Sequence, residues 1–414
     1  MAKIESLKAR EILDSRGNPT IEVTLTTSRA EARASAPSGM STGRREAAEL
    51  RDGDQDRFAG LGVRRAAAGA EGEIAQALIG KTFDQQELDA LLIELDGTER
   101  RSRLGANTLI AVSMAFARAE AAEQGLPLYR HLNGLLGLGE CALPSPAFNV
   151  LNGGRHAMDG LAIQEFLVIA EGARSFSERI EAASALIASL KDLLRRAGLD
   201  TGMGDEGGFA PRLASTEEAL DMLAAAAREA LRGGFSFGID AAASGLWREG
   251  AYHLGGKPEK IFSPAELKDW YLGLAGRYPL RYLEDPFEED DLENTATLRE
   301  ALGGKALVVG DDLTVTSASR IREAAERRAV SAVIIKPNQI GTVTETLEAI
   351  RAAREEGLAL CASHRSGETN DAFIADLAVA AAAEHIKAGS LARGERVAKY
   401  NRLAEIEEEL SRAL

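Results

Sequence analysis

The stretch Val333–His364 reads VIIKPNQIGTVTETLEAIRAAREEGLALCASH. It begins with an apolar run that ends at Lys336, continues with a helical pattern over 343–356, and closes with a second apolar run that stops at His364. A buried strand, a helix and another buried strand in this order are typical of a βαβ unit with parallel strands. The stretch therefore favours an α/β fold.

Eight apolar runs of this kind follow residue 140, and most of them end at a polar or charged residue. They are Ala147–Val150, Phe166–Ile169, Phe237–Asp240, Tyr282–Glu284, Leu307–Asp311, Val333–Lys336, Leu358–His364 and His385–Lys387. Helical patterns over 176–197, 215–232, 343–356 and 371–383 separate several of them. This rhythm favours a closed, parallel-type barrel with helices outside, and an open doubly wound sheet is the alternative. Only 152–163 joins the first two strands, so we expect an irregular barrel.

The first 134 residues predict a smaller α+β domain. Its expected strands are Ile21–Thr27 and Glu31–Ala36, and its expected helices are 59–79, 84–95 and 106–123. Gly134–Gly139 marks the expected boundary, so the two predicted domains are 1–134 and 140–414. A chain of 414 residues is long enough for both.

Charge and composition exclude several classes of partner. The 49 basic and 64 acidic residues give a net charge of −15, which disfavours nucleic acid and anionic membranes as partners. Cys141 and Cys361 lie far apart and suggest neither a disulfide framework nor a zinc site. The first residues show no signal-peptide pattern, and apolar stretches such as Leu109–Ala117 reach about half a membrane span. We therefore expect a soluble, cytoplasmic protein.

Charged side chains stand near the predicted strand ends, where barrel enzymes carry their active sites. They are Glu165, Asp240, Glu284, Asp311, Lys336, His364 and Lys387. From Asp240 onward the successive spacings are 44, 27, 25, 28 and 23 residues, each about one strand plus one helix. These side chains are therefore expected to meet at one mouth of the barrel.

The types of these residues indicate the chemistry. Asp240, Glu284 and Asp311 form an oxygen-rich set of the kind that Mg²⁺ prefers, although each alone is more often a helix cap or a surface charge. Lys336 stands out because the chain has 38 arginines and only 11 lysines, and lysine can act as a base whereas arginine cannot. A snorkelling lysine or an ion pair with Asp311 is the alternative. Lys387 fits a charge partner for a substrate carboxylate.

Two loops add further polar groups. The loop Gly202–Phe209 holds two carboxylates among four glycines, which allows Glu206 to be presented rigidly to the mouth, although a plain turn gives the same pattern. The segment Ser363–Ser366 offers hydroxyl, imidazole and guanidinium donors suited to phosphate, with a polar loop cap as the alternative.

Ordered motifs along the whole chain resemble the enolases, or phosphopyruvate hydratases. They begin with Ala9-Arg-Glu-Ile-Leu-Asp-Ser-Arg-Gly-Asn-Pro-Thr20 and continue with Ser38-Gly-Met-Ser-Thr-Gly43, Leu151-Asn-Gly-Gly-Arg-His156, Gln164-Glu-Phe166, Gly204-Asp-Glu-Gly-Gly-Phe209, Glu284-Asp-Pro286 and Ser363-His-Arg-Ser-Gly-Glu-Thr369. The resemblance implies a small N-terminal domain on an irregular ββαα(βα)₆ barrel of the TIM type, assembled as a homodimer or higher homo-oligomer. It also implies a cytoplasmic lyase of glycolysis that interconverts 2-phosphoglycerate with phosphoenolpyruvate and water.

The resemblance further implies a role for each matching residue. Lys336 is expected to remove the C2 proton, and Glu206, assisted by Glu165, to help the C3 hydroxyl leave. The expected ligands of two Mg²⁺ per site are Asp240, Glu284, Asp311 and, for the second ion, Ser41. The expected substrate-binding residues are His156, His364, Arg365, Ser366 and Lys387.

Several residues beside the motifs depart from the usual enolase pattern. They are Met40, Arg155, Gly245, Pro337, Asn370, Ala388 and Leu391. One interpretation is ordinary sequence drift. The alternative is a paralogue resembling the carboxyphosphonoenolpyruvate synthases of phosphonate biosynthesis, in which Arg155 would hold a larger anionic donor. A non-catalytic protein on the same scaffold predicts the loss of a metal ligand or of the lysine base, and the sequence retains them all.

Overall fold

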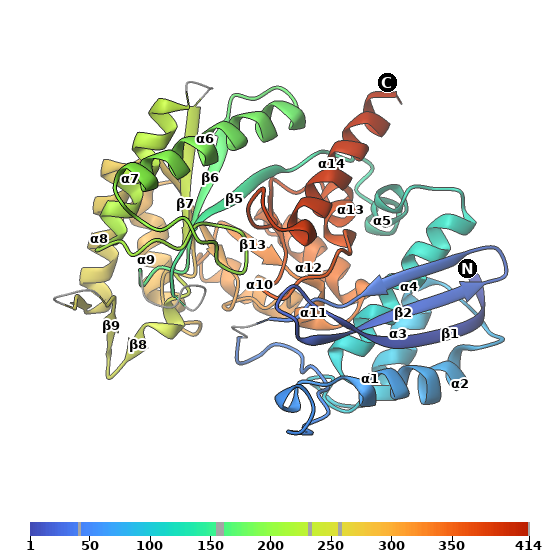
Figure 1. The fold of residues 1–414 in the computed structure, drawn as a ribbon. Coiled ribbons are helices and arrows are strands. Elements are labelled where there is room, and N and C mark those ends of the chain that lie inside the picture. Colours follow the sequence, from blue (N-terminus) through green and yellow to red (C-terminus); the bar gives the residue numbers. More distant parts are fainter. Residues whose placement is uncertain (40–42, 155–160, 231–233, 256–258, 413–414) are drawn as a thin grey trace.

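The computed structural model describes residues 1–39, 43–154, 161–230, 234–255 and 259–412. The chain forms a closed eight-stranded barrel, with a four-stranded sheet and its helices beside it (Figure 1). Ser41 and His156, two of the expected site residues, lie outside the described residues, as do Met40 and Arg155. The expected fold class is confirmed.

The N-terminal part is an antiparallel sheet covered by helices. Its strands, in the spatial order β3-β2-β1-β4, are β1 (Ala2–Leu13), β2 (Pro19–Thr27), β3 (Glu31–Ser35) and β4 (Thr82–Phe83). Its helices are α1 (Arg64–Gly69), α2 (Ala75–Leu78), α3 (Gln85–Asp96), α4 (Ala106–Glu123) and α5 (Leu128–Leu136), with a π-helical turn (Ala70–Ile74) joining α1 to α2. The long helix α4 is buried almost all round, because the sheet contacts one side of it and helices of the barrel contact another.

The strand β1 lies inside this sheet, although its sequence was not expected to form a strand. Ala2 and Ile4 are buried in the usual alternation, but a shift of register against β2 follows between Ile4 and Ser6. The next buried side chain is therefore Leu7, and the period of two is broken. The two strands that were expected correspond to β2 and β3.

The barrel closes in the order β11-β12-β13-β14-β15-β5-β6-β7, with β7 paired to β11. Its strands are β5 (Ser145–Asn152), β6 (Glu165–Glu171), β7 (Gly234–Asp240), β11 (Leu280–Glu284), β12 (Leu307–Gly310), β13 (Ala332–Ile335), β14 (Ala359–Ser363) and β15 (His385–Lys387). Its helices are α6 (Phe176–Arg196), α7 (Thr216–Glu229), α8 (Pro264–Arg277), α9 (Leu292–Leu302), α10 (Ala318–Glu326), α11 (Pro337–Ile340), α12 (Val343–Glu355), α13 (Phe373–Ala380) and α14 (Gly394–Arg412). A small sheet of β8 (Trp247–Arg248), β9 (Ala251–His253) and β10 (Ile261–Phe262) follows β7. Each of the eight expected apolar runs overlaps a different barrel strand.

One strand corrects the expectation of a parallel barrel. β6 runs antiparallel to both of its neighbours, β5 and β7. A parallel return needs a crossover of a dozen or more residues, usually a helix, whereas an antiparallel return can be made by a short link such as 153–164. The chain therefore enters β6 at the rim where β5 ends. As a consequence, Glu165, the first residue of β6, pairs with Asp240, the last residue of β7.

Charged side chains join the N-terminal part to the barrel. Both terminal nitrogens of Arg118 on α4 donate to the carboxylate of Asp371, at 2.6 and 2.7 Å. Arg101 donates to Glu345 on α12 at 2.6 Å. The helix α5 crosses the expected domain end at residue 134, so the division at 134–140 stays a prediction.

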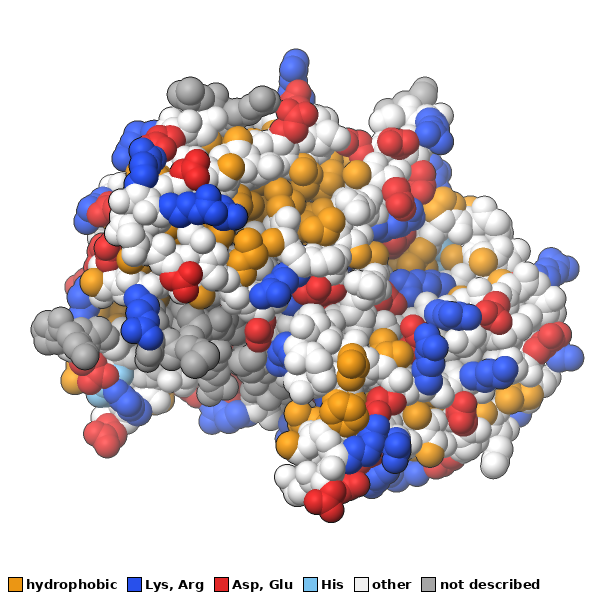
Figure 2. Space-filling model, viewed as in Figure 1, with side chains coloured by type: hydrophobic (Ala, Val, Ile, Leu, Met, Phe, Trp, Pro, Cys, Tyr) orange, Lys and Arg blue, Asp and Glu red, His pale blue; other side chains and the backbone are white. Residues whose placement is uncertain are grey.

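The surface mixes both signs of charge. In the face seen in Figure 2, Lys and Arg side chains are interspersed with Asp and Glu, so the negative charge is not gathered in one patch there. Among the helices of the described residues, none combines the length and the apolar character that a membrane span requires.

Candidate active site

The rim of the barrel brings the expected charged side chains together. Asp240, Glu284 and Lys387 are the last residues of β7, β11 and β15. Asp311 and Lys336 directly follow β12 and β13. Because strand ends in a closed barrel meet at one rim, spacings of 23 to 44 residues become contacts in space.

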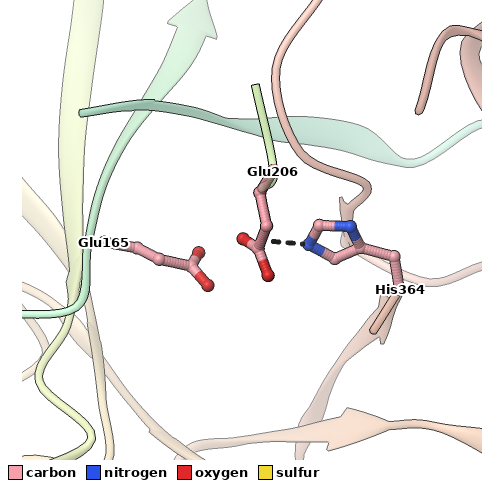
Figure 3. Close-up of side chains that lie close together, drawn as sticks. All are labelled: Glu165, Glu206 and His364. Atoms are coloured by element: carbon pink, nitrogen blue, oxygen red, sulfur yellow. Dashed lines mark ion pairs between the residues drawn. The ribbon is translucent and has the colours of Figure 1, made fainter. Parts of the chain in front are cut away.

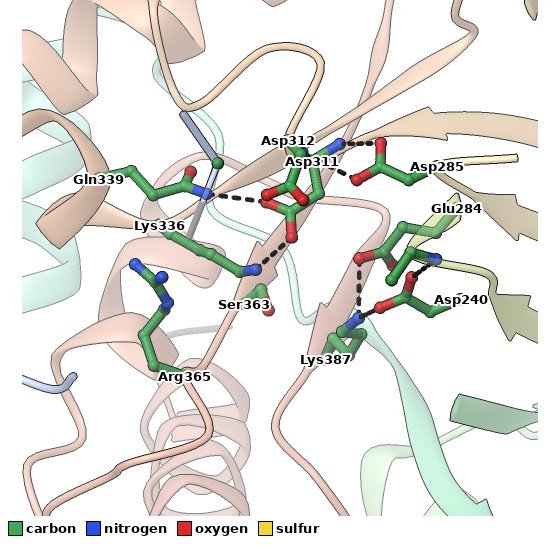
Figure 4. A network of polar contacts seen from close by, with 12 residues as sticks. Asp240, Glu284, Asp285, Asp311, Asp312, Lys336, Gln339, Ser363, Arg365 and Lys387 are labelled. Carbon is green, nitrogen blue, oxygen red and sulfur yellow. Dashed lines mark hydrogen bonds and ion pairs between the residues drawn. The ribbon is translucent and has the colours of Figure 1, made fainter. Parts of the chain in front are cut away.

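Lys387 lies at the centre of one group of carboxylates (Figure 4). Its Nζ is 3.0 Å from Asp240 Oδ2, 2.8 Å from Glu284 Oε1 and 3.3 Å from Glu165 Oε2. Tyr282 holds the other oxygen of Glu284 with a hydrogen bond of 2.8 Å. Burial, followed by the charge of Asp240, raises the pKa of Glu284 to about 8. These carboxyl groups lie so close together that further positive charge would be needed to keep them all ionised.

Asp311 is the centre of a second group (Figure 4). Its Oδ2 accepts a hydrogen bond from Lys336 Nζ, and its Oδ1 accepts one of 2.9 Å from Gln339. Asp285 accepts the backbone N–H groups of Asp311 and Asp312, at 2.9 and 2.8 Å, and so fixes this turn. Burial alone would lower the pKa of Lys336, but the carboxylate of Asp311 raises it above its usual value. The ion pair that was the alternative interpretation of Lys336 is therefore present.

Glu206 lies between Glu165 and His364 (Figure 3). Asn149 on β5 donates to Glu206 Oε2 at 2.9 Å, and His364 Nε2 is 3.5 Å from the same oxygen. Burial, followed by the charge of Glu206, raises the pKa of Glu165 well above its usual value. Burial lowers the pKa of His364 to about 4, so its imidazole is neutral at pH 7. One carboxyl of the pair can therefore keep a proton beside an ionised partner.

Arg365 and Ser366 follow β14 and meet residues of the N-terminal part. Both oxygens of Glu46 accept hydrogen bonds from Arg365, at 2.9 and 3.0 Å, and Asn338 accepts another at 3.0 Å. Arg16 donates to Ser366 Oγ at 3.3 Å. The two parts of the chain thus build this side of the site together.

One pocket collects nine of the expected residues. They are Glu165, Glu206, Asp240, Asp311, Lys336, His364, Arg365, Ser366 and Lys387. Glu284 is fully buried and does not line the pocket. It accepts a hydrogen bond from Lys387, which does line the pocket.

Comparison with known proteins agrees with this architecture. The chain matches the family models "Enolase, N-terminal domain" over residues 4–132 and "Enolase, C-terminal TIM barrel domain" over residues 140–414. It is 48% identical to an enolase of Rubrobacter xylanophilus, over 100% of this chain and 96% of that protein. It is 46% identical to enolase B of Dictyostelium discoideum, over 99% of this chain and 95% of that protein.

The chain belongs to the enolase family. Enolases are lyases, and membership implies a divalent metal. The donors at the rim fit one, because they are carboxylate oxygens without sulfur and a hard cation prefers such ligands. Among the described residues, the buried Glu165 Oε2 accepts no hydrogen bond and faces Lys387 Nζ at 3.3 Å.

The three acidic side chains expected to bind one Mg²⁺ contact two different lysines. Asp240 and Glu284 face Lys387, whereas Asp311 faces Lys336. Among the described residues, Asp311 instead groups with Asp285 and Asp312, whose ligand atoms lie within 4.8 Å of one another. The carboxylate of Asp285 already accepts the backbone N–H groups of Asp311 and Asp312. It therefore holds this turn in place rather than serving as a metal ligand.

The sequence did not reveal several residues that hold the enolase site. Glu46, Asn149, Gln339 and Arg396 contact Arg365, Glu206, Asp311 and His364, respectively. None stands at a charged strand end, so no spacing pattern singled them out. Asp285 was visible inside the motif Glu284-Asp-Pro286, but a motif alone did not show its orienting role.

Proposed function

We propose that the protein is a phosphopyruvate hydratase, which interconverts 2-phosphoglycerate with phosphoenolpyruvate and water. The observation that carries this proposal is the convergence of a lysine, several carboxylates and an arginine in one buried pocket of an enolase-family chain. A small anion with a carboxylate at one end and a phosphate at the other matches that distribution of charge.

The metal ligands in this proposal are Asp240, Glu284 and Asp311 for one Mg²⁺ and Ser41 for a second. When bound, these ions would hold the substrate carboxylate and would compete with both lysines for the three acidic side chains. If Asp311 turned to a metal ion, its charge would no longer offset the burial that lowers the pKa of Lys336.

Lys336 and Glu206 carry the proton transfers. Lys336 Nζ takes the proton from C2, and its own electron pair forms the new N–H bond. Glu165 and Glu206 share one proton, and Glu206 delivers it to the C3 hydroxyl, which leaves as water while the C2–C3 double bond forms. Glu165 assists by holding a proton beside Glu206, since its pKa is raised by burial and by that neighbour.

The remaining pocket residues hold the substrate. Arg365 and Ser366 bind the phosphate, Lys387 binds the carboxylate, and His364 lines the pocket beside Glu206. His156 belongs to the same proposal through its motif and lies outside the described residues.

A direct assay tests the proposal. Purified protein with Mg²⁺ and 2-phosphoglycerate should produce phosphoenolpyruvate, followed by its ultraviolet absorbance, and EDTA should abolish turnover until Mg²⁺ is restored. Lys336→Ala should lower kcat by about 10²- to 10⁴-fold, because a general base is removed. Lys305→Ala, an exposed lysine just before the amino end of β12, should leave kcat unchanged. No turnover by the parent protein would overturn the assigned reaction, and an active Lys336→Ala variant would overturn the assigned base.

The carboxyphosphonoenolpyruvate synthase-like alternative is not favoured, since both similar proteins named above are enolases. One departure that prompted it has a structural reason. Pro337 is the first residue of α11, a position where a missing N–H breaks no helical hydrogen bond. The homo-oligomer and the cytoplasmic location stay predictions.

A further inference from the structure

Arg396 is a fully buried arginine in the first turn of α14, behind the site rather than in it. Its Nη1 donates to the backbone carbonyl of Arg365 at 2.5 Å, and its Nη2 donates to that of Ser366 at 2.6 Å. Nη2 also lies 3.3 Å from the carbonyl of Asp205, next to Glu206. These carbonyls fix the guanidinium plane between the loop after β14 and the loop of Glu206.

The same guanidinium meets His364. Arg396 Nη1 lies 2.7 Å from His364 Nδ1. A guanidinium carries only N–H donors, so Nδ1 must accept and cannot carry a proton. The neutral imidazole then holds its proton on Nε2. A doubly protonated ring would set an N–H group and a positive charge against Arg396, and the burial that lowers the pKa of His364 opposes it as well.

The other ring nitrogen faces the acid. His364 Nε2 is 3.5 Å from Glu206 Oε2, the oxygen that already accepts from Asn149. With the proton on Nε2, the ring presents an N–H group to a carboxylate. The opposite tautomer would present a lone pair to the same oxygen and repel it.

We propose that Arg396 is a positioning residue that fixes His364 in the Nε2–H tautomer and thereby holds Glu206 in place. Its effect on turnover rests on the proposed function, in which Glu206 delivers the proton to the leaving hydroxyl. The tautomer itself is a property of the resting protein and does not depend on the reaction.

The first test observes the ring directly. The chain has five histidines, so ¹⁵N-histidine labelling gives few imidazole signals, and His364→Gln identifies those of His364. At pH 7 we expect a protonated Nε2 and an unprotonated Nδ1 in the parent protein. In Arg396→Met we expect a second tautomer or an imidazolium. A protonated Nδ1 in the parent protein, or an unchanged spectrum in Arg396→Met, would overturn the proposal.

The second test measures kinetics with 2-phosphoglycerate. Arg396→Met should lower kcat about 10- to 100-fold, because the acid is misplaced. KM should rise by a smaller factor than kcat falls, because Arg396 bonds to the backbone carbonyls of Arg365 and Ser366 and not to their side chains. Arg396→Lys keeps one charged donor and should recover part of kcat together with the parent tautomer. If Arg396→Met does not fold, Arg396→Lys and the parent spectrum still decide the question.

A matched control comes from the same helix. Arg402 on α14 binds both oxygens of Asp376, at 2.9 and 3.0 Å, and touches neither His364 nor the pocket. Arg402→Met should lower thermal stability yet leave the His364 signals and kcat at parent values. Equal losses of kcat in both variants would show that Arg396 acts only on the stability of the fold and would overturn the proposed positioning role. A parent protein that shows the Nε2–H signal but no turnover would refute the reaction and leave the tautomer assignment standing.

Discussion

At the scale of single residues, Glu46 is the partner of the arginine expected to hold phosphate. Both side chains are buried, and Glu46 accepts from Arg365 with both of its oxygens. Glu46→Gln keeps the shape but removes the charge, leaving a buried guanidinium poorly compensated. We expect the free energy of unfolding to fall by about 3 kcal/mol, measured by urea denaturation.

The matched control for that change is another ion pair between the same two parts of the chain. Glu345 binds Arg101, and the two side chains are 18% and 12% exposed. Since water screens a partly exposed pair, Glu345→Gln should lower the free energy of unfolding by about 1 kcal/mol or less. An equal fall in the free energy of unfolding in the two variants would contradict the view that burial makes the Glu46 ion pair more stabilising.

At the scale of elements, the loop between α6 and α7 presents Glu206 through close backbone packing. Its glycines bond within the loop, Gly204 N–H to Gly208 C=O at 2.9 Å and Gly207 N–H to Gly204 C=O at 3.1 Å. A Cβ on Gly208 would lie 2.6 Å from Asn152 Oδ1 and 2.7 Å from Asn149 Oδ1. Asn149 is the side chain that donates to Glu206, so a Cβ at Gly208 disturbs the hydrogen bond that holds the acid.

We therefore expect Gly208→Ala to lower kcat about 100-fold, since a displacement of about 1 Å at a catalytic group can have that effect. Gly202→Ala is the control in the same loop, because the nearest atoms to its Cβ would be those of the Asp200 carboxylate, no closer than 3.3 Å. Steady-state kinetics of both variants with 2-phosphoglycerate make the comparison. A Gly208→Ala enzyme with parent kcat would show that the loop tolerates a shift and does not need rigid packing.

At the scale of the whole molecule, Asp371 connects the barrel to the N-terminal part. It binds Arg118 on α4 and accepts the backbone N–H of Ser35 at 3.1 Å. Burial alone would raise the pKa of Asp371, but the charge of Arg118 and these hydrogen bonds hold it below its usual value. A carboxyl with a lowered folded-state pKa stabilises the fold above its unfolded pKa of about 3.9, and that contribution disappears as the pH falls through the folded value.

Asp371→Asn should therefore lower the thermal midpoint most at pH 7. The difference in midpoint between the variant and the parent protein should shrink below about pH 4. Differential scanning fluorimetry from pH 7 down to pH 3 measures the difference. Asp269→Asn, an exposed aspartate on α8, should show little difference at any pH. A difference for Asp371→Asn that stays constant across this range would mean that the charge of Asp371 is not what stabilises the contact.

Much of the fold was predictable because its signals are local. The apolar run 333–336 was expected to be a strand and overlaps β13, and the pattern 343–356 matches α12. β1 was missed because a bulge breaks its alternation, and its pairing with β2 and β4 could not be read from the sequence. The direction of β6 was also hidden, since periodicity does not encode the sense in which a strand runs.

The sequence by itself determined which side chains lie at the rim, because a repeated strand–helix unit returns the chain to the same edge every 23 to 44 residues. Asp240, Glu284, Asp311, Lys336 and Lys387 could be identified in this way. Only the tertiary structure decided what each of them contacts. Glu46 reaches Arg365 across 319 residues, and Arg396 reaches His364 from a helix that carries no site residue of its own. Such contacts depend on how the two domains and the last helix pack together. Packing between distant segments produces no repeating pattern in the sequence.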